Sequence, residues 1–156
     1  MCGPFWAAKR RHLDLDKAVS QPAPASLRVL AIGNEDRVKV MLHRGGYGNA
    51  SIIGTNDVWD GHVLHEHAPW DIVAIAYRPD DGRDVALCRA LRGGGVETAI
   101  VVSNIFSSRT KVIDVLNAGG DDCIADAMPD GELRARLAAL LRRYARHQDA
   151  RAIHST

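Results

Sequence analysis

Two patterns of apolar residues alternate along the chain after residue 27. Short runs in which nearly every residue is apolar are typical of strands that are buried on both faces of a sheet. Five such runs lie at residues 28–32, 51–53, 71–77, 98–102 and 122–125. Between them, apolar residues recur at helical spacing. This spacing predicts helices over residues 35–44, 57–67 and 82–92, from 107 or 108 to 117, and over 130–147.

The strict alternation of strand and helix fixes the expected fold class. Strands that are separated by helices pair in parallel through right-handed crossovers. We therefore expect a doubly wound α/β domain, with a five-stranded parallel sheet and helices on both faces. Glycine pairs and triplets at residues 45–46, 93–95 and 119–120 mark the ends of three of the helices. A chain of 156 residues has room for one such domain.

The helical spacing also predicts which side chains face the core. In the last helix, one stripe contains Leu133, Leu137, Leu140, Leu141 and Tyr144. In the helix that ends at residue 117, we expect Val112, Val115 and Leu116 to face inward. The same helix would then leave Arg109, Lys111 and Asp114 in solvent.

Composition and charge narrow the function classes. Hydrophobic residues make up 46% of the chain and charged residues 25%, as in ordinary globular proteins. The net charge of +1 gives no general electrostatic case for binding nucleic acid or a membrane surface. The longest uncharged apolar run, residues 98–108, is too short to span a bilayer, and the N-terminus shows no secretory pattern. We expect a cytoplasmic protein, and its many arginines and alanines hint at a GC-rich bacterial genome.

Cysteines and histidines offer only weak signals for a metal site. The three cysteines are widely spaced, so Cys88 and Cys123 are expected to be small buried residues in a reducing compartment. His62, His65 and Glu66 would share one face of a helix, with His67 beside them. No cysteine or further ligand can be placed nearby, so a solvated helix face is the favoured interpretation. We predict no metal ion and no other cofactor.

The two ends of the chain differ in composition from its middle. Residues 8–17 are charged on nearly every helical face, and residues 21–26 (QPAPAS) cannot continue a helix. Residues 1–26 are therefore expected to be a disordered or loosely ordered extension. Residues 27–146 form the predicted domain, and residues 147–156 a polar tail or truncated linker.

The last strand and helix carry a specific resemblance. Residues 118–128 (AGGDDCIADAM) and 129–143 (PDGELRARLAALLRR) are similar to the closing part of a response-regulator receiver domain. The winged-helix (OmpR/PhoB) type is the most similar. Upstream, residues 28–32, 71–75 and 79–82 follow the same family's order and spacing. The resemblance covers residues 27–146 and implies a flavodoxin-like fold with strand order 2-1-3-4-5, in a two-component signalling protein.

Receiver domains transfer a phosphoryl group by a definite set of side chains. A carboxylate at the end of the central strand is the acceptor, and an acidic pair after the first strand holds Mg²⁺. A hydroxyl after the fourth strand and a lysine after the fifth bind the phosphoryl oxygens. These groups converge because ligands of open α/β sheets bind at the carboxyl ends of the strands.

Most of this set is missing at the matching positions. The resemblance places Ala76 at the acceptor position and Asp126 at the lysine. At the acidic pair it places Asn34 and Glu35, or Glu35 and Asp36 if one residue is inserted. Ser103 alone matches, at the hydroxyl position. We therefore predict a degenerate receiver, a pseudo-receiver, that is not an enzyme.

Three functions follow as hypotheses. The first is a phosphorylation-independent interaction module in signalling or transcription regulation, which binds a protein partner or a second copy of itself. The resemblance implies dimerisation through the helix ending at residue 117, strand 122–125 and helix 130–144, with charges from Arg109, Lys111, Asp114, Arg134 and Arg142. DNA would be bound only through a separate domain, and no membrane is involved.

The two alternatives use the same strand ends differently. One is a true phosphoacceptor that uses Asp80 or Asp81, with Glu35, Asp36 and Mg²⁺. The other is a flavodoxin-like domain that binds a small molecule in the crevice at the strand ends.

Overall fold

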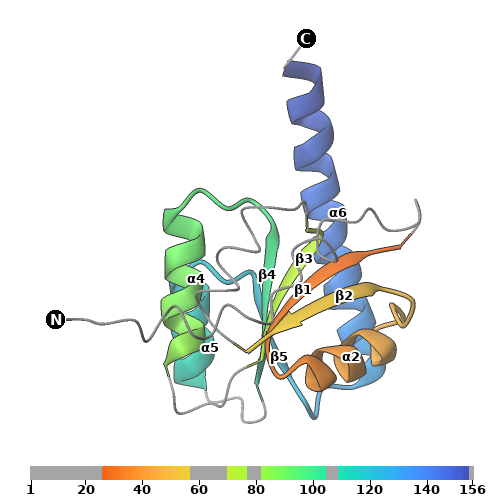
Figure 1. Ribbon diagram of the computed structural model, residues 1–156, viewed down its shortest axis with the longest axis vertical. Coiled ribbons are helices and arrows are strands. Elements are labelled where there is room, and N and C mark those ends of the chain that lie inside the picture. The colour runs from red at the N-terminus through yellow and green to blue at the C-terminus, as the bar shows by residue number, and fades with distance from the viewer. Residues whose placement is uncertain (1–25, 57–69, 77–81, 105–108, 155–156) are drawn as a thin grey trace, which may run out of the picture.

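The fold was obtained as a computed structural model that describes residues 26–56, 70–76, 82–104 and 109–154, without the side chains of residues 104 and 146–154. Within these residues, five strands alternate with four helices (Figure 1). The strands are β1 (Arg28–Gly33), β2 (Ser51–Thr55), β3 (Ile72–Ala76), β4 (Ala99–Asn104) and β5 (Asp122–Ala125). The helices are α2 (Glu35–Arg44), α4 (Arg83–Gly93), α5 (Arg109–Asn117) and α6 (Asp130–His154).

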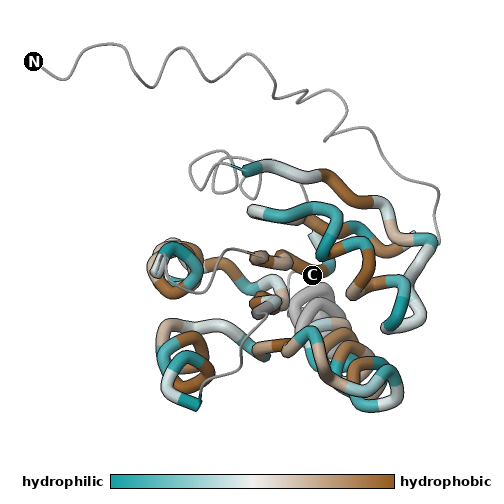
Figure 2. Tube along the Cα trace, turned by 90° about the horizontal axis from the view of Figure 1, so that it is seen from below, coloured by the Kyte–Doolittle hydropathy of each residue, from teal (hydrophilic) through white to brown (hydrophobic). Residues whose placement is uncertain are grey.

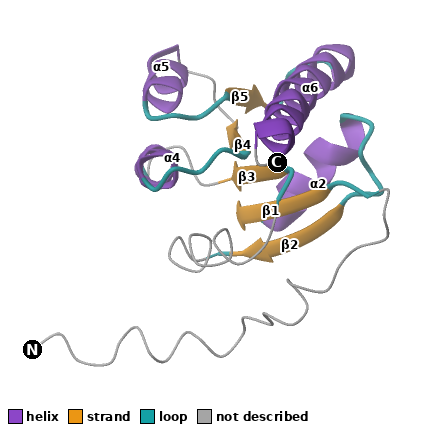
Figure 3. Ribbon diagram, turned by 90° about the horizontal axis from the view of Figure 1, so that it is seen from above, coloured by secondary structure: helices purple, strands orange, loops and turns teal. Residues whose placement is uncertain are grey.

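The strands form one parallel sheet with the order β2-β1-β3-β4-β5. Helices α2 and α6 cover one face of the sheet, and α4 and α5 cover the other (Figure 3). This confirms the predicted doubly wound α/β fold and its strand order.

The core lies in two layers, one on each side of the sheet. Successive side chains of a strand point to opposite faces. Leu30 and Ile32 of β1 thus pack with α4 and α5, whereas Val29 and Ala31 pack with α2 and α6. All four are fully buried, and the most hydrophobic stretches of the tube lie along the strands and the inner sides of the helices (Figure 2).

Most element boundaries agree with those expected from the sequence. Strand β5 matches residues 122–125, and the other described elements agree to within about two residues, a normal uncertainty at element ends. Helix α6 is the exception, because its backbone continues to His154 and projects past the sheet (Figure 1). The predicted helix over 57–67, including His62, His65, Glu66 and His67, lies outside the described residues, as does the extension over 1–25.

The outer face of α5 differs from the prediction. Val115 is buried as expected, but Leu116 is 45% exposed, and Ile113 is 55% exposed. Lys111 was expected in solvent, yet its Nζ lies 3.0 Å from a carboxylate oxygen of Asp84, which is only 2% exposed. A buried carboxylate needs a partner charge, so Lys111 turns toward α4.

One arginine joins several segments at the amino end of β4 and β5. The guanidinium of Arg92, in α4, donates to the carbonyl oxygens of Val96, Thr98 and Gly119, to the Asp121 carboxylate and to the Tyr144 hydroxyl. Tyr144 and the Ile100 amide also donate to Asp121, both at 2.8 Å. Gly119 has φ +106°, and a Cβ there would lie 2.2 Å from Cγ of Arg92, so only glycine fits.

We expect Arg92→Met to destabilise the domain by about 3 kcal/mol, because it removes the nearest cation from the nearly buried Asp121 carboxylate and leaves only the longer contact with Arg143, at 4.0 Å. Urea unfolding measures this. The matched control is Arg89→Met, since Arg89 lies on the same helix with an exposed side chain. Equal unfolding free energies for the two variants would contradict the role of Arg92.

Both described cysteines are buried free thiols, as predicted. Burial raises the pKa of Cys88 to about 12 and that of Cys123 to about 11. The nearby Asp84 carboxylate also raises the pKa of Cys88. The thiolate forms are therefore strongly disfavoured in the folded state.

Stability should consequently fall above about pH 9, where unfolded thiols ionise and folded ones do not. Between pH 8 and pH 10, Cys88 contributes about 1 kcal/mol to this loss. Urea unfolding at the two pH values should show a smaller loss for Cys88→Ala than for the unmodified protein. An identical loss in both proteins would show that the buried thiol does not titrate as described.

Candidate functional site

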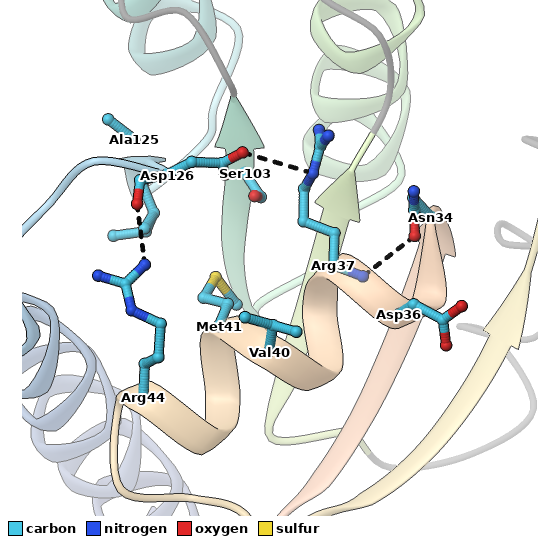
Figure 4. Close-up of a pocket in the computed structure, with 10 residues that line it drawn as sticks. Asn34, Asp36, Arg37, Val40, Met41, Arg44, Ser103, Ala125 and Asp126 are labelled. Carbon is cyan, nitrogen blue, oxygen red and sulfur yellow. Dashed lines mark hydrogen bonds and ion pairs between the residues drawn. The ribbon is translucent and has the colours of Figure 1, made fainter.

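The carboxyl edge of the sheet brings most of the expected site residues together. Gly33 pairs with Ala76, and Ser103 pairs with Ile124, so Asn34, Ala76, Ser103 and Asp126 follow or end adjacent parallel strands. A pocket of about 390 Å³ opens there, between α2 and the ends of β4 and β5 (Figure 4). Asp80 and Asp81 lie outside the described residues.

The pocket has an apolar part and a polar part. The apolar part comes from α2 and β5 and consists of Val40, Met41, Ile124 and Ala125. The polar side chains are Asn34, Asp36, Arg37, Arg44, Ser103 and Asp126. The sequence predicts Asn34, Asp36, Ser103 and Asp126 at this edge but gives no sign of Arg37 and Arg44. Helical spacing places these two arginines on α2 without indicating what they contact.

Asn34 is used as the N-cap of α2. Its side-chain oxygen accepts a hydrogen bond from the backbone amide of Arg37 at 3.0 Å. The backbone amide of Asn34 donates to the Ala76 carbonyl at 2.9 Å. An N-cap oxygen satisfies one of the free amides of the first helical turn. The oxygen that could have bound a metal ion is thus engaged in holding the helix.

The neighbouring carboxylates face away from the pocket centre. Glu35 lies over β2, where a Cβ on Gly54 would come within 2.0 Å of its Oε2. Lys39 binds it at 2.7 Å, and this hydrogen bond raises the pKa of Lys39. Asp36 is 94% exposed at the side chain and points outward (Figure 4). Neither carboxylate converges with the other polar groups.

Arg44 fixes the loop between β5 and α6. Its guanidinium donates to the carbonyl oxygens of Asp126, at 2.9 Å, and Met128, and to the Asp130 carboxylate at 2.8 Å. Three hydrogen bonds to one loop hold the wall of the pocket in place and occupy this cation.

Ser103 and Asp126 differ sharply in their surroundings. Ser103 is 2% exposed, and its hydroxyl makes no hydrogen bond to any part of the chain that the structure describes. The Asp126 carboxylate lies 3.7 Å from Nε of Arg37. The site therefore contains a buried hydroxyl and a loose pair of opposite charges.

The last residue of β3 provides no nucleophile for phosphoryl transfer. Ala76, at the end of β3, offers only a methyl group and is 3% exposed. Within residues 26–56, 70–76, 82–104 and 109–154, no three His, Cys, Asp or Glu side chains gather as a metal site would require.

The charges expected on the dimer face do not all lie on one side. Arg109 and Asp114 are exposed on α5, and Arg142 is exposed on α6. Arg134, however, donates to the Arg44 carbonyl at 3.3 Å and so lies on the α2 side of its helix, opposite to the expected position. Beside β5 the cation is instead Arg136.

Arg136 was missed as a residue of this face, although its spacing from Glu132 is a recognisable helical ion pair. It binds Asp122 at 3.0 Å and Glu132 at 2.8 Å. These two carboxylates raise the pKa of Arg136, first through the hydrogen bonds that Arg136 donates to Glu132.

We expect no saturable Mg²⁺ binding at this edge, because Asn34 caps a helix, Glu35 is paired and Ala76 has no oxygen ligand. An amide NMR titration that follows Asn34, Ser103 and Asp126 tests this. Restoring two carboxylates with Asn34→Asp and Ala76→Asp should create binding in the millimolar range or tighter, by analogy with other oxygen-ligand sites. Saturable shifts in the unmodified protein would contradict the interpretation.

Comparison with known proteins supports the fold. No family model and no curated protein matches the chain. Among the described residues, no helix is both long and apolar enough to cross a membrane. The architecture, in contrast, matches many solved structures.

Three of these similar structures are response regulators or their receiver domains. A Francisella receiver domain is 18% identical, with a TM-score of 0.61, and the match covers 76% of this chain and 98% of that one. A Clostridium difficile two-component response regulator is 22% identical at the same TM-score and coverage. An orphan response regulator of H. pylori is 20% identical, with a TM-score of 0.58, covering 74% and 97%. The chain thus has the fold of response-regulator receiver domains.

Proposed function

We propose that this chain is a phosphorylation-independent receiver-type module that acts through protein contacts and forms a homodimer through α5, β5 and α6. The observation that carries the proposal is that the receiver fold is kept while the side chains for phosphoryl transfer are replaced by others. The resemblance puts Ala76 where receivers carry the phosphoacceptor, while the described residues form the five-stranded sheet with a core layer on each side.

The surrounding charges also disfavour a phosphoryl group. Asp126 places a carboxylate where the resemblance expects the lysine that binds phosphoryl oxygens. A second negative charge in that position would repel the group rather than stabilise it. The side-chain oxygen of Asn34, already bound to the Arg37 amide, cannot replace the missing acidic pair.

The α5–β5–α6 face offers a suitable contact surface. Ile113 and Leu116 are exposed and three residues apart, so they are neighbours on α5. They are two of the three large exposed hydrophobic residues in the described part of the chain. Burying them removes apolar surface from water, which favours association.

Two-fold symmetry makes this face self-complementary. In a symmetric dimer, if one residue of the face contacts a second residue on the other copy, that second residue makes the same contact in return. Arg109 and Asp114 are both exposed on α5, and the Glu132–Arg136 pair flanks β5 on α6. A face with both signs of charge can pair with itself, and such pairs set register more than affinity.

A signalling role in transcription would follow from partners that this surface recruits. Without a phosphoryl signal, the dimer population should depend on protein concentration alone.

We expect a weak homodimer, with a dissociation constant on the order of 100 μM, as for small interfaces. Light scattering over a concentration series should give the same constant with and without beryllofluoride and Mg²⁺. Leu116→Glu should weaken the dimer by about tenfold or more, since it puts like charges face to face. Val40→Glu is the matched control, because Val40 is 58% exposed on α2, away from this face.

A strict monomer at high micromolar concentration would refute the dimer. A dimer that appears only with beryllofluoride would refute its independence of phosphorylation. Equal weakening by Leu116→Glu and Val40→Glu would refute the choice of face.

A further inference from the structure

We infer that the pocket at the carboxyl edge is a binding site for a small zwitterion with an apolar side group, of the amino-acid class. This inference concerns a different surface from the dimer face and does not depend on dimerisation. It uses the part of the receiver fold from which phosphoryl chemistry is missing.

The first support is the buried hydroxyl of Ser103. Polar groups in protein interiors are almost always hydrogen-bonded, because an unsatisfied one costs stability. Ser103 is 2% exposed and lines the pocket, and its hydroxyl has no partner in the described part of the chain. A ligand with a polar atom at this depth would supply the missing hydrogen bond.

The second support is the loose pair of opposite charges at the rim. The 3.7 Å between Nε of Arg37 and Oδ2 of Asp126 is too long for a hydrogen bond. Within the described residues, this contact is the only side-chain interaction of either group. Both remain partly exposed, so the guanidinium can receive a carboxylate and the Asp126 carboxylate can receive an ammonium (Figure 4).

The remaining charged groups around the pocket are engaged or point elsewhere. Arg44 is bound to the β5–α6 loop, and Asp36 faces solvent. A simple anion would therefore meet Arg37 together with the repulsion of Asp126. A simple cation would be attracted by Asp126 but repelled by Arg37. A zwitterion can pair with both charges at once.

The third support is the apolar part of the pocket. Met41 and Ile124 are almost fully buried beneath it, and Val40 extends it at the rim. A side group packed on these residues would cover the exposed Val40. The volume of about 390 Å³ lies at the small end of ligand pockets, which suits a ligand of amino-acid size.

The test is an amide NMR titration of the full chain with L-leucine and L-phenylalanine. We expect saturable shifts at Arg37, Ser103 and Asp126, with the same fitted constant at each. N-acetyl-L-phenylalanine lacks the ammonium, L-phenylalaninamide lacks the carboxylate, and glycine lacks the side group. Each of these, and inorganic phosphate, should bind at least about tenfold more weakly.

Substitutions in the pocket test whether the NMR shifts report binding at this site. Asp126→Asn and Ser103→Ala should each weaken binding by about fivefold or more, as expected for a lost ligand hydrogen bond. Glu97→Gln is the matched control, because Glu97 is an exposed carboxylate just before β4, at the opposite end of that strand from Ser103. It should leave binding unchanged.

Several outcomes of the titration would overturn the inference. No saturable shift with either amino acid up to its solubility, or shifts confined to another surface, would overturn the inference. So would phosphate, the acetylated analogue or the amide binding as tightly as the zwitterion. The dimer constant measured by light scattering is unaffected by these outcomes, so failure here and failure of the proposed function are distinguishable.

Discussion

The position of the functional edge depends on an ion pair at the opposite end of the sheet. Arg92 and Asp121 bind each other just before β5 begins, and Arg92 also binds the Thr98 carbonyl just before β4. Five donor contacts from one guanidinium fix the start of both strands. Because each residue of a strand advances it by about 3.3 Å, anchoring the start of β4 and β5 sets how far along them later residues lie. Ser103 and Asp126 therefore face the pocket in a defined register.

The fold could be predicted because each strand is apolar on both faces. Only a sheet covered by helices on both sides buries such runs, and the helical stretches between them supply the cover. The end of α6 was harder to place. Residues 147–154 (HQDARAIH) contain no proline or glycine, so nothing in them forces the helix to stop. The positions of Ala76, Ser103 and Asp126 could be predicted because each lies at the carboxyl end of a strand, and parallel strands end at the same edge of the sheet.

What the sequence could not settle is the rotation and pairing of helical side chains. Helix α5 is short, and Val112, Ile113, Val115 and Leu116 form two adjacent stripes of similar hydrophobicity. The contact of Lys111 with the buried Asp84 accompanies the rotation that leaves Ile113 and Leu116 outside. The contact of Arg134 with α2 is likewise tertiary. Such choices arise from packing between distant segments, which local periodicity does not encode.

We propose a receiver fold whose strand-end edge serves binding instead of phosphoryl transfer. The most direct test is the intact mass of the full chain after incubation with acetyl phosphate or a histidine kinase and Mg²⁺. We predict an unchanged mass, because Ala76 offers no carboxylate and the described edge holds no metal site. A stable gain of one phosphoryl group, mapped by peptide analysis to Asp80 or Asp81, would contradict the account.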